Sequence, residues 1–373
     1  MKFNKIIFVL FTLNSFAYAN DCSNINDVAK KIIAKNQITG MAIAIVNQDK
    51  ATFCNYGYTN KNKKAPITDK SIFEIASITK TFTALLAGIA VVDNKLDLNA
   101  PITKYIPELA SNKNYDKINN KELLTHVAGL PSGFDKSYTE KELLNSAIAM
   151  KFTDEPASYY RYSNPGIALS GLTITRLYKN DFQSVLNSLI LDKLGMIYTS
   201  IDINPKYQNL VVTGYNKHNQ PVDFMHIGIE NPAGGLKSNT YDLVRYLQLQ
   251  ISTQDQKFQQ ALSIVHKNYY CLYEDGTYQQ LAWEYHPTSD LFKKFMPDNK
   301  NRNITSSHPL PSNCQNTING FIDKTGNSSG MTSYIAYSPN KKVGVVILSN
   351  NALKPDVVDL GRHILQNTAR IFK

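Results

Sequence analysis

The stretch that decides the fold reads MAIAIVNQDKATFCNYGY and covers residues 41–58. Its first six residues form an uninterrupted apolar run, short enough for a buried strand and containing β-branched side chains. Residues 47–50 then form a polar turn, and residues 51–58 return as a second strand. Just before this hairpin, apolar residues recur at helical spacing over residues 25–35. The sequence therefore predicts a helix followed by a β-hairpin.

The other end of the chain has the same elements in the opposite order. Residues 332–337 and 343–348 are strand-like around a turn, and residues 357–372 have a helical pattern. Strands at both ends predict an α/β fold of the α+β type, with one antiparallel sheet formed by both chain ends and flanked by helices. Further helical patterns cover residues 81–92, 121–127, 167–177 and 241–251.

This pattern predicts that one domain is inserted into another. We expect an α/β domain from residues 20–80 and 240–373, and a mostly helical domain from residues 81–239. The roughly 350 residues left without a leader are enough for two interleaved domains around a large core. The active site is expected at their interface.

The first residues have the features of a secretory signal peptide. Lys2 and Lys5 supply a positive start, residues 6–13 are apolar, and Ala17-Tyr18-Ala19 resembles a cleavage site. The apolar run is well short of the roughly 20 residues that span a bilayer. We therefore expect removal of residues 1–19, a periplasmic protein, and no membrane attachment after cleavage.

The net charge of +10 does not indicate a nucleic-acid-binding protein. The basic residues are scattered singly or in pairs, with residues 61–64 as the densest run, and no basic stripe lies on a recognisable binding fold. A solvated basic surface explains the charge, and it favours anionic ligands by long-range attraction. We expect a monomer that acts on a small molecule.

The four cysteines predict disulfides rather than a zinc site. No pair has C-x-x-C spacing and none is next to a histidine. Three pairings are possible, and the sequence does not choose among them. We favour Cys22 with Cys54 and Cys271 with Cys314, because each pair brackets a segment that is locally organised.

The first candidate for chemistry is Ser77-Ile78-Thr79-Lys80, which opens an apolar helical stretch. At positions i and i+3 of a helix the Ser77 hydroxyl and the Lys80 amine share one face. A serine in the first turn also lies at the positive end of the helix dipole, which favours an alkoxide. The motif alone is weak, because a second S-x-x-K runs from Ser338 to Lys341 across a turn. The motif predicts a nucleophile only when further catalytic motifs accompany it in the same chain.

Two further candidate catalytic motifs are present in the chain. Tyr162-Ser163-Asn164 is one of several Y-x-N copies, but it alone precedes Pro165-Gly166, which predicts an irregular loop before a helix starting at Ile167. A tyrosine that only packs and caps a turn is the alternative interpretation. Lys324-Thr325-Gly326 precedes a predicted strand, and it offers a cation, a hydroxyl and a glycine that lets a substrate approach the backbone.

The three motifs in this order resemble those of the class C serine β-lactamases, which share a fold with penicillin-binding DD-peptidases. The resemblance runs over nearly the whole chain outside the leader. It includes non-catalytic stretches such as residues 73–82, residues 122–131 and residues 234–238. It implies a β-lactamase/transpeptidase-like fold and a cephalosporinase-type enzyme that hydrolyses the β-lactam amide through an acyl-enzyme on Ser77. No cofactor or metal is implied.

The resemblance also implies a role for each matching residue. Ser77 attacks the lactam carbonyl, and Lys80 and Tyr162 exchange its proton as a coupled pair, either of which is the formal base. Asn164 binds the amide of the substrate and orients Lys80. The remaining implied substrate-binding residues are Lys324 and Thr325 for the carboxylate, Gly326, and Asn327, whose backbone N–H joins that of Ser77 in an oxyanion hole.

Two places depart from the family pattern. Relatives place a glutamine after the Gly-Leu-Pro segment, where this chain has Ser132-Gly133. Relatives also carry asparagines and an arginine near the substrate carboxylate, where this chain has Asn350-Asn351-Ala352-Leu353-Lys354. Lys354 or Asn351 is expected to compensate.

One alternative activity remains open, whereas a non-catalytic protein and a catalytic His126 are set aside. A DD-peptidase or esterase of the same fold is the main alternative, and it would use the same three catalytic residues. A non-catalytic penicillin sensor would need a tether or a fused domain, which the sequence does not show. His126 is expected to be buried and hydrogen-bonded rather than catalytic.

Overall fold

A computed structural model describes residues 18–19, 22–62, 64–133, 139–152, 154–287, 308–315, 319–352 and 354–370. The predicted signal peptide therefore lies outside the described residues, except for Tyr18–Ala19, which form the short strand β1. Among the described residues, no helix is both long enough and apolar enough to cross a membrane.

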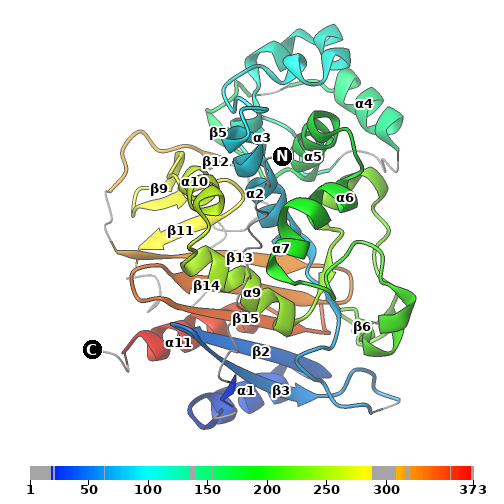
Figure 1. The fold of residues 1–373 in the computed structure, drawn as a ribbon, viewed down its shortest axis with the longest axis vertical. Coiled ribbons are helices and arrows are strands. Elements are labelled where there is room, and N and C mark those ends of the chain that lie inside the picture. The colour runs from blue at the N-terminus through cyan, green and yellow to red at the C-terminus, as the bar shows by residue number, and fades with distance from the viewer. Residues whose placement is uncertain are drawn as a thin grey trace, which may run out of the picture.

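The sheet at the centre of the molecule joins the two ends of the chain (Figure 1). In the described part of the chain it has nine strands in the order β1-β3-β2-β15-β14-β13-β11-β10-β9, antiparallel except for β1 beside β3. From one edge to the other these are β1, β3 Lys50–Gly57, β2 Gly40–Asn47, β15 Val343–Ser349, β14 Thr332–Ser338, β13 Gly320–Asn327, β11 Glu284–Pro287, β10 Thr277–Gln279 and β9 Tyr270–Tyr273.

The predicted hairpins and their meeting are confirmed. β2 pairs with β15 in a register that sets Ile45 opposite Val345 and Ala44 opposite Val346. Every residue of β14 and β15 is buried, because helices cover both faces of the central strands. That is why these strands read as continuous apolar runs rather than as alternating ones.

Two helical layers cover the sheet. The terminal helices α1 Ser23–Asn36 and α11 Asp356–Arg370 pack together on one face, where α11 lies against β14 and β15. The other face carries α2 Thr79–Val92, α9 Thr240–Ile251 and α10 Gln256–Val265. α2 is apolar all round and almost completely buried, as expected for a helix in the middle of a large protein.

A separate group of helices lies beyond α2, at the top of Figure 1. It comprises α3 Asn120–Leu124, α4 Glu140–Ala149 and α5 Asn164–Tyr178, with shorter helices α6 Phe182–Leu186, α7 Asp192–Leu194 and α8 Asn231–Gly234 nearby. α3 and α4 begin with capping boxes, in which Asn119 pairs with Glu122 and Thr139 with Glu142. Short strands connect the regions: β4 Phe73–Glu74 with β8 Lys237–Ser238, β5 Tyr159–Tyr160 with β12 His308–Pro309, and β6 Gly214–Tyr215 with β7 Pro221–Val222.

Two helix boundaries differ from the prediction. α5 begins at Asn164 rather than at Ile167, because proline fits the first turn of a helix, where its missing N–H would have no partner anyway. α3 ends at Leu124, whereas a helical pattern was predicted to residue 127. His126 has a φ of 60°, which is a left-handed conformation that a helix cannot continue through.

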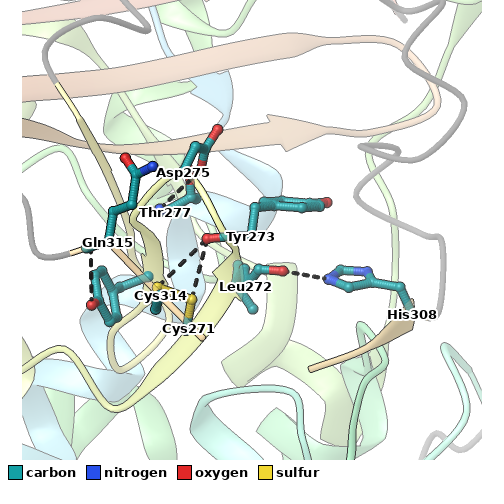
Figure 2. The surroundings of a disulfide bond; sticks show 9 residues. Cys271, Leu272, Tyr273, Asp275, Thr277, His308, Cys314 and Gln315 are labelled. Carbon is teal, nitrogen blue, oxygen red and sulfur yellow. Dashed lines mark hydrogen bonds between the residues drawn. A yellow bond between two sulfur atoms is a disulfide. The ribbon is translucent and has the colours of Figure 1, made fainter. Parts of the chain in front are cut away.

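Both favoured disulfides are present. Cys22 bonds to Cys54, which attaches the start of α1 to β3. Cys271 bonds to Cys314 and so attaches residues 308–315 to β9; Figure 2 shows this bond, with the His308 ring donating to the carbonyl of Leu272 (3.2 Å). The pairing follows from tertiary contact, since each pair joins segments that lie side by side.

Candidate active site

The nucleophile candidate lies in a tight turn between the sheet and α2. Ser77 is the middle residue of a short 3-10 helix, Ala76–Ile78, that runs directly into α2. The preceding residue, Ala76, has a φ of 45°, a left-handed conformation that is unfavourable for a residue with a Cβ. This conformation turns the chain sharply from β4 into the helix. The Ser77 side chain is half-buried, so part of it remains accessible to solvent.

The three predicted catalytic side chains meet at the Ser77 hydroxyl. Lys80 Nζ donates a hydrogen bond to Ser77 Oγ at 3.0 Å, and the Tyr162 hydroxyl donates to the same oxygen at 2.8 Å. The lysine comes from one turn further along α2, as its spacing predicted. Tyr162 comes from the segment between β5 and α5, 85 residues later in the chain. One hydroxyl is therefore in hydrogen-bond contact with two groups that can exchange its proton.

Lys80 is completely buried and lies beside a backbone carbonyl. Its ammonium also donates to the carbonyl of Ala233 in α8. Burial is the main cause that lowers the pKa of Lys80, with the charge of Lys324 acting in the same direction and the Tyr162 oxygen opposing it. A lysine in this position can exist as a neutral proton acceptor more readily than one in water.

Tyr162 lies between two cations. The Nζ atoms of Lys80 and Lys324 are 4.9 Å and 5.0 Å from the centre of its ring. Burial by itself raises the pKa of Tyr162, but the positive charges of Lys80 and Lys324 and the hydrogen bonds with Lys80 and Ser77 outweigh it. The pKa of Tyr162 is therefore lowered, which favours the phenolate that could take a proton from Ser77.

The Lys324-Thr325-Gly326 segment forms the end of β13 and lies against the nucleophile turn. Lys324 is 2% exposed, Thr325 is half-buried and Asn327 is exposed. A Cβ on Gly326 would overlap the carbonyl of Ile75 and the hydroxyl of Ser333, and would lie 3.2 Å from the backbone nitrogen of Ser77. Glycine is thus required for β13 to pass this close to Ser77.

Replacing Gly326 with alanine is expected to lower kcat/KM by about 100-fold or more. The added methyl group would push β13 away from Ser77, and a displacement of about 1 Å in an active site can cost on the order of 100-fold in rate. The measurement is hydrolysis of a chromogenic β-lactam, the substrate class that the sequence resemblance implies, by folded protein. Gly88→Ala is the matched control: its Cβ would lie 2.9 Å from the Ala261 carbonyl, a crowded contact between α2 and α10. It should change thermal stability but leave kcat/KM within about threefold, and equal activity losses in both variants would contradict the explanation.

The structure gives the Asn351 side chain other partners, and in the part of the chain that it describes it does not join the Asn164 side chain to Lys80. Asn351 is completely buried: its carbonyl oxygen accepts from Thr39 N (2.8 Å) and its amide donates to Asn219 (3.1 Å). The suggestion that Asn351 compensates for the missing arginine is therefore wrong, because both ends of its amide are already hydrogen-bonded, to the Thr39 backbone and to the Asn219 side chain. Asn164 donates its backbone N–H to Ser132 (3.2 Å), and in the described part of the chain no hydrogen bond joins its side chain to Lys80.

Two contributors to the site were not predicted. Ser333 Oγ donates to the Ile75 carbonyl at 2.8 Å and lies 3.2 Å from the Gly326 carbonyl, so it connects β14, β13 and the turn before Ser77. The Ala233 carbonyl holds Lys80. A backbone carbonyl carries no sequence signal, and a serine in a buried strand is not distinguishable from a packing residue.

One cluster has the residue types of a metal site. Glu284, His286 and Asp323 place possible ligand atoms within 4.8 Å of one another, among the described residues that were searched. The Asp323 carboxylate, however, already accepts from His286 (3.1 Å) and from the guanidinium of Arg362 (3.2 Å). Burial raises the pKa of Asp323, but these two neighbours outweigh it and hold it below its usual range. A cation beside the carboxylate fits a structural ion-pair network better than a metal site.

Comparison with known proteins agrees with this geometry. The family model described as Beta-lactamase matches residues 25–369. A beta-lactamase of Pseudomonas fluorescens is 32% identical over 334 residues, which cover 87% of this chain and 92% of that protein. Among solved structures, a beta-lactamase/D-alanine carboxypeptidase from Pseudomonas syringae is 30% identical with a TM-score of 0.81, covering 92% of this chain and 98% of that one.

A class C beta-lactamase in complex with cefoxitin has a TM-score of 0.83 at 28% identity, and the match covers 92% of this chain and 98% of that one. The family-model match to residues 25–369 spans Ser77, Lys80, Tyr162 and Lys324. The chain belongs to the beta-lactamase family and is a serine beta-lactamase of the class C type.

Proposed function

We propose that this enzyme is a cephalosporinase that works through an acyl-enzyme on Ser77. The observation that carries the proposal is the pair of hydrogen bonds to Ser77 Oγ, from Lys80 and from Tyr162. In acylation, Ser77 Oγ bonds to the lactam carbonyl carbon while its proton passes to the coupled Lys80 and Tyr162 pair. The carbon–nitrogen bond then breaks, and the same pair delivers a proton to the departing nitrogen.

Deacylation uses the same groups in the reverse direction. A water molecule gives a proton to the Tyr162 and Lys80 pair as its oxygen bonds to the ester carbonyl carbon. The bond from that carbon to Ser77 Oγ then breaks, and the pair returns the proton to Oγ as the opened product leaves. The backbone N–H groups of Ser77 and Asn327 stabilise the negative oxygen in both steps. The close approach of Gly326 to the Ser77 nitrogen supports this placement.

The substrate is positioned by the remaining predicted residues. Lys324 and Thr325 bind its carboxylate, since the ammonium is buried beside Tyr162 and the hydroxyl is half-exposed on the same strand. Asn164 binds the side-chain amide. Lys354 supplies a second cation: its backbone N–H donates to Thr332 (3.1 Å), which is the β14 partner of Asn327.

The alternative activity is that of a DD-peptidase on the same fold. The relative from Pseudomonas syringae is described as both a beta-lactamase and a D-alanine carboxypeptidase, and it matches 92% of this chain. Both activities acylate Ser77, so the difference lies in how fast water removes the acyl group.

A steady-state panel separates the two activities. A penicillin, a cephalosporin, a carbapenem and a D-Ala-D-Ala peptide are compared, with mass spectrometry of the intact protein during turnover. We expect rapid turnover of the cephalosporin with no lasting adduct. Persistent acylation of Ser77 by the cephalosporin, together with release of D-alanine from the peptide, would instead establish the peptidase.

The remaining proposals concern location and organisation. We propose that residues 1–19 are removed on export and that the enzyme acts as a periplasmic monomer. The site is proposed to lie between an α/β domain of residues 20–80 and 240–373 and a mostly helical domain of residues 81–239. The two disulfides are supporting observations, since such bonds persist in oxidising compartments.

A further inference from the structure

His126 lies directly behind Tyr162. It follows α3, is 1% exposed, and places its ring centre 4.3 Å from that of Tyr162 at an angle of 33°. Its edge meets Tyr160 of β5 at 6.0 Å and 88°. The ring of Tyr162 therefore has the Lys80 and Lys324 ammonium groups close by and a tilted imidazole packed against it.

His126 also holds the backbone on both sides of Tyr162. Its carbonyl oxygen accepts from Arg161 N at 2.7 Å, and its Nδ1 accepts from Ser163 N at 3.2 Å. Ser163 in turn caps α5 by accepting from Gly166 N (3.1 Å). Three contacts from one residue thus hold the residue before Tyr162, the residue after it and the Tyr162 ring.

The imidazole is neutral in this environment. Burial, followed by the positive charges of Lys324 and Lys80, holds the pKa of His126 well below its usual value. Because Nδ1 accepts a hydrogen bond, the proton of the neutral ring is on Nε2. In the described part of the chain, the titratable groups facing it are Lys80 on α2, Lys324 on β13, and Tyr160 and Tyr162.

We propose that His126 is a positioning residue for Tyr162, and that its Nδ1 acceptor, rather than its ring, places the phenol oxygen on Ser77. It contacts neither Ser77 nor the expected substrate, so it acts only through Tyr162. The requirement is geometric, because a displacement of about 1 Å at a proton-transfer group can cost on the order of 100-fold in rate. This inference rests on the role proposed above for Tyr162.

A pair of amide substitutions isolates the Nδ1 contact. In asparagine the side-chain oxygen is bonded to Cγ, as Nδ1 is in histidine, so His126→Asn keeps an acceptor for Ser163 N and also tolerates the left-handed backbone. In His126→Gln the amide is one bond further out and the acceptor is misplaced. We expect His126→Asn to retain kcat within about threefold, and His126→Gln to lose about 10- to 100-fold in kcat with little change in KM.

The pH profile separates positioning from stability. His126→Gln should move the acid limb of kcat/KM, because Tyr162 no longer keeps its distances to Lys80 and Lys324. His266→Asn is the matched control: His266 is another buried histidine, hydrogen-bonded to Gln280 (2.9 Å) and Gln250 (2.7 Å). It should lower thermal stability and leave both kcat and the acid limb unchanged.

Two outcomes would overturn the inference. One is that His126→Gln retains the kcat and pH profile of the wild type; the other is that the asparagine variant is no better than the glutamine variant. Tyr162→Phe, measured alongside, distinguishes this from failure of the proposed mechanism. If Tyr162→Phe itself keeps full activity, the role of Tyr162 is wrong, whereas a large loss there with neutral His126 variants contradicts only the positioning role.

Discussion

Ser77→Ala is expected to abolish turnover of a chromogenic cephalosporin, with kcat/KM falling by about five orders of magnitude or more. The reason is that, among the residues that the structure describes, Ser77 has the one hydroxyl that is hydrogen-bonded to both Lys80 and Tyr162. The side chain is small and half-buried, so its removal leaves only a small gap in the fold. Mass spectrometry of the intact protein with a slowly hydrolysed β-lactam should show a covalent adduct on the wild type and none on the variant.

The chain supplies its own control for this experiment. Ser338 begins the second S-x-x-K motif, but it ends β14 and its hydroxyl is directed to the Gly320 carbonyl (3.4 Å). Ser338→Ala should therefore keep both turnover and the adduct. Retention of most activity in Ser77→Ala, or loss of the adduct in Ser338→Ala, would refute the assignment of the nucleophile.

Lys324→Met is expected to lower kcat/KM at neutral pH by about 100- to 1,000-fold, because a buried charge beside Tyr162, the proposed partner of the substrate carboxylate, is removed. Methionine keeps much of the length and apolar volume of lysine. The positive charge of Lys324 lowers the pKa of both Tyr162 and Lys80. Its loss therefore raises both pKa values, whichever of the two is the formal base.

The sign of the pH effect follows from this. Activity needs the deprotonated form of the coupled pair and is lost as the pH falls through its pKa. In Lys324→Met the acid limb of kcat/KM should thus move to higher pH, and part of the lost activity should return at alkaline pH. Lys237→Met is the control, since Lys237 is also a buried lysine but donates to the Ile201 carbonyl (2.7 Å). An acid limb that stays in place in Lys324→Met, or moves equally in both variants, would contradict this account.

The local elements could be predicted because they depend on patterns within single segments. The hairpin of β2 and β3, the strands β14 and β15 and the helices at both ends follow from the spacing of apolar residues. The short strands β9 to β11 were not predicted, because strands of three or four residues carry too little pattern. The start of α5 was misplaced because Pro165 was interpreted as part of a loop, although it occupies the first helical turn.

By itself, the sequence determined the class of chemistry. Ser77 with Lys80 one turn later, Tyr162 with Asn164, and Lys324-Thr325-Gly326 before a strand identify the residue types and their order along the chain. The roles of Asn164 and Thr325 stay predictions, and the compensating role of Asn351 was wrong because its amide is used inside the protein.

Only the tertiary structure decided how these residues act on one another. The contact of Tyr162 with Ser77, the Ala233 carbonyl on Lys80, the Ser333 hydroxyl on the nucleophile turn and the His126 ring behind Tyr162 all join residues far apart in the chain. Proton affinity depends on burial and on charges within a few ångströms, and neither quantity is a property of a segment. The sequence therefore predicts Ser77 as the nucleophile, whereas the folded arrangement of two lysines around one tyrosine sets the pKa values of the groups that would take its proton.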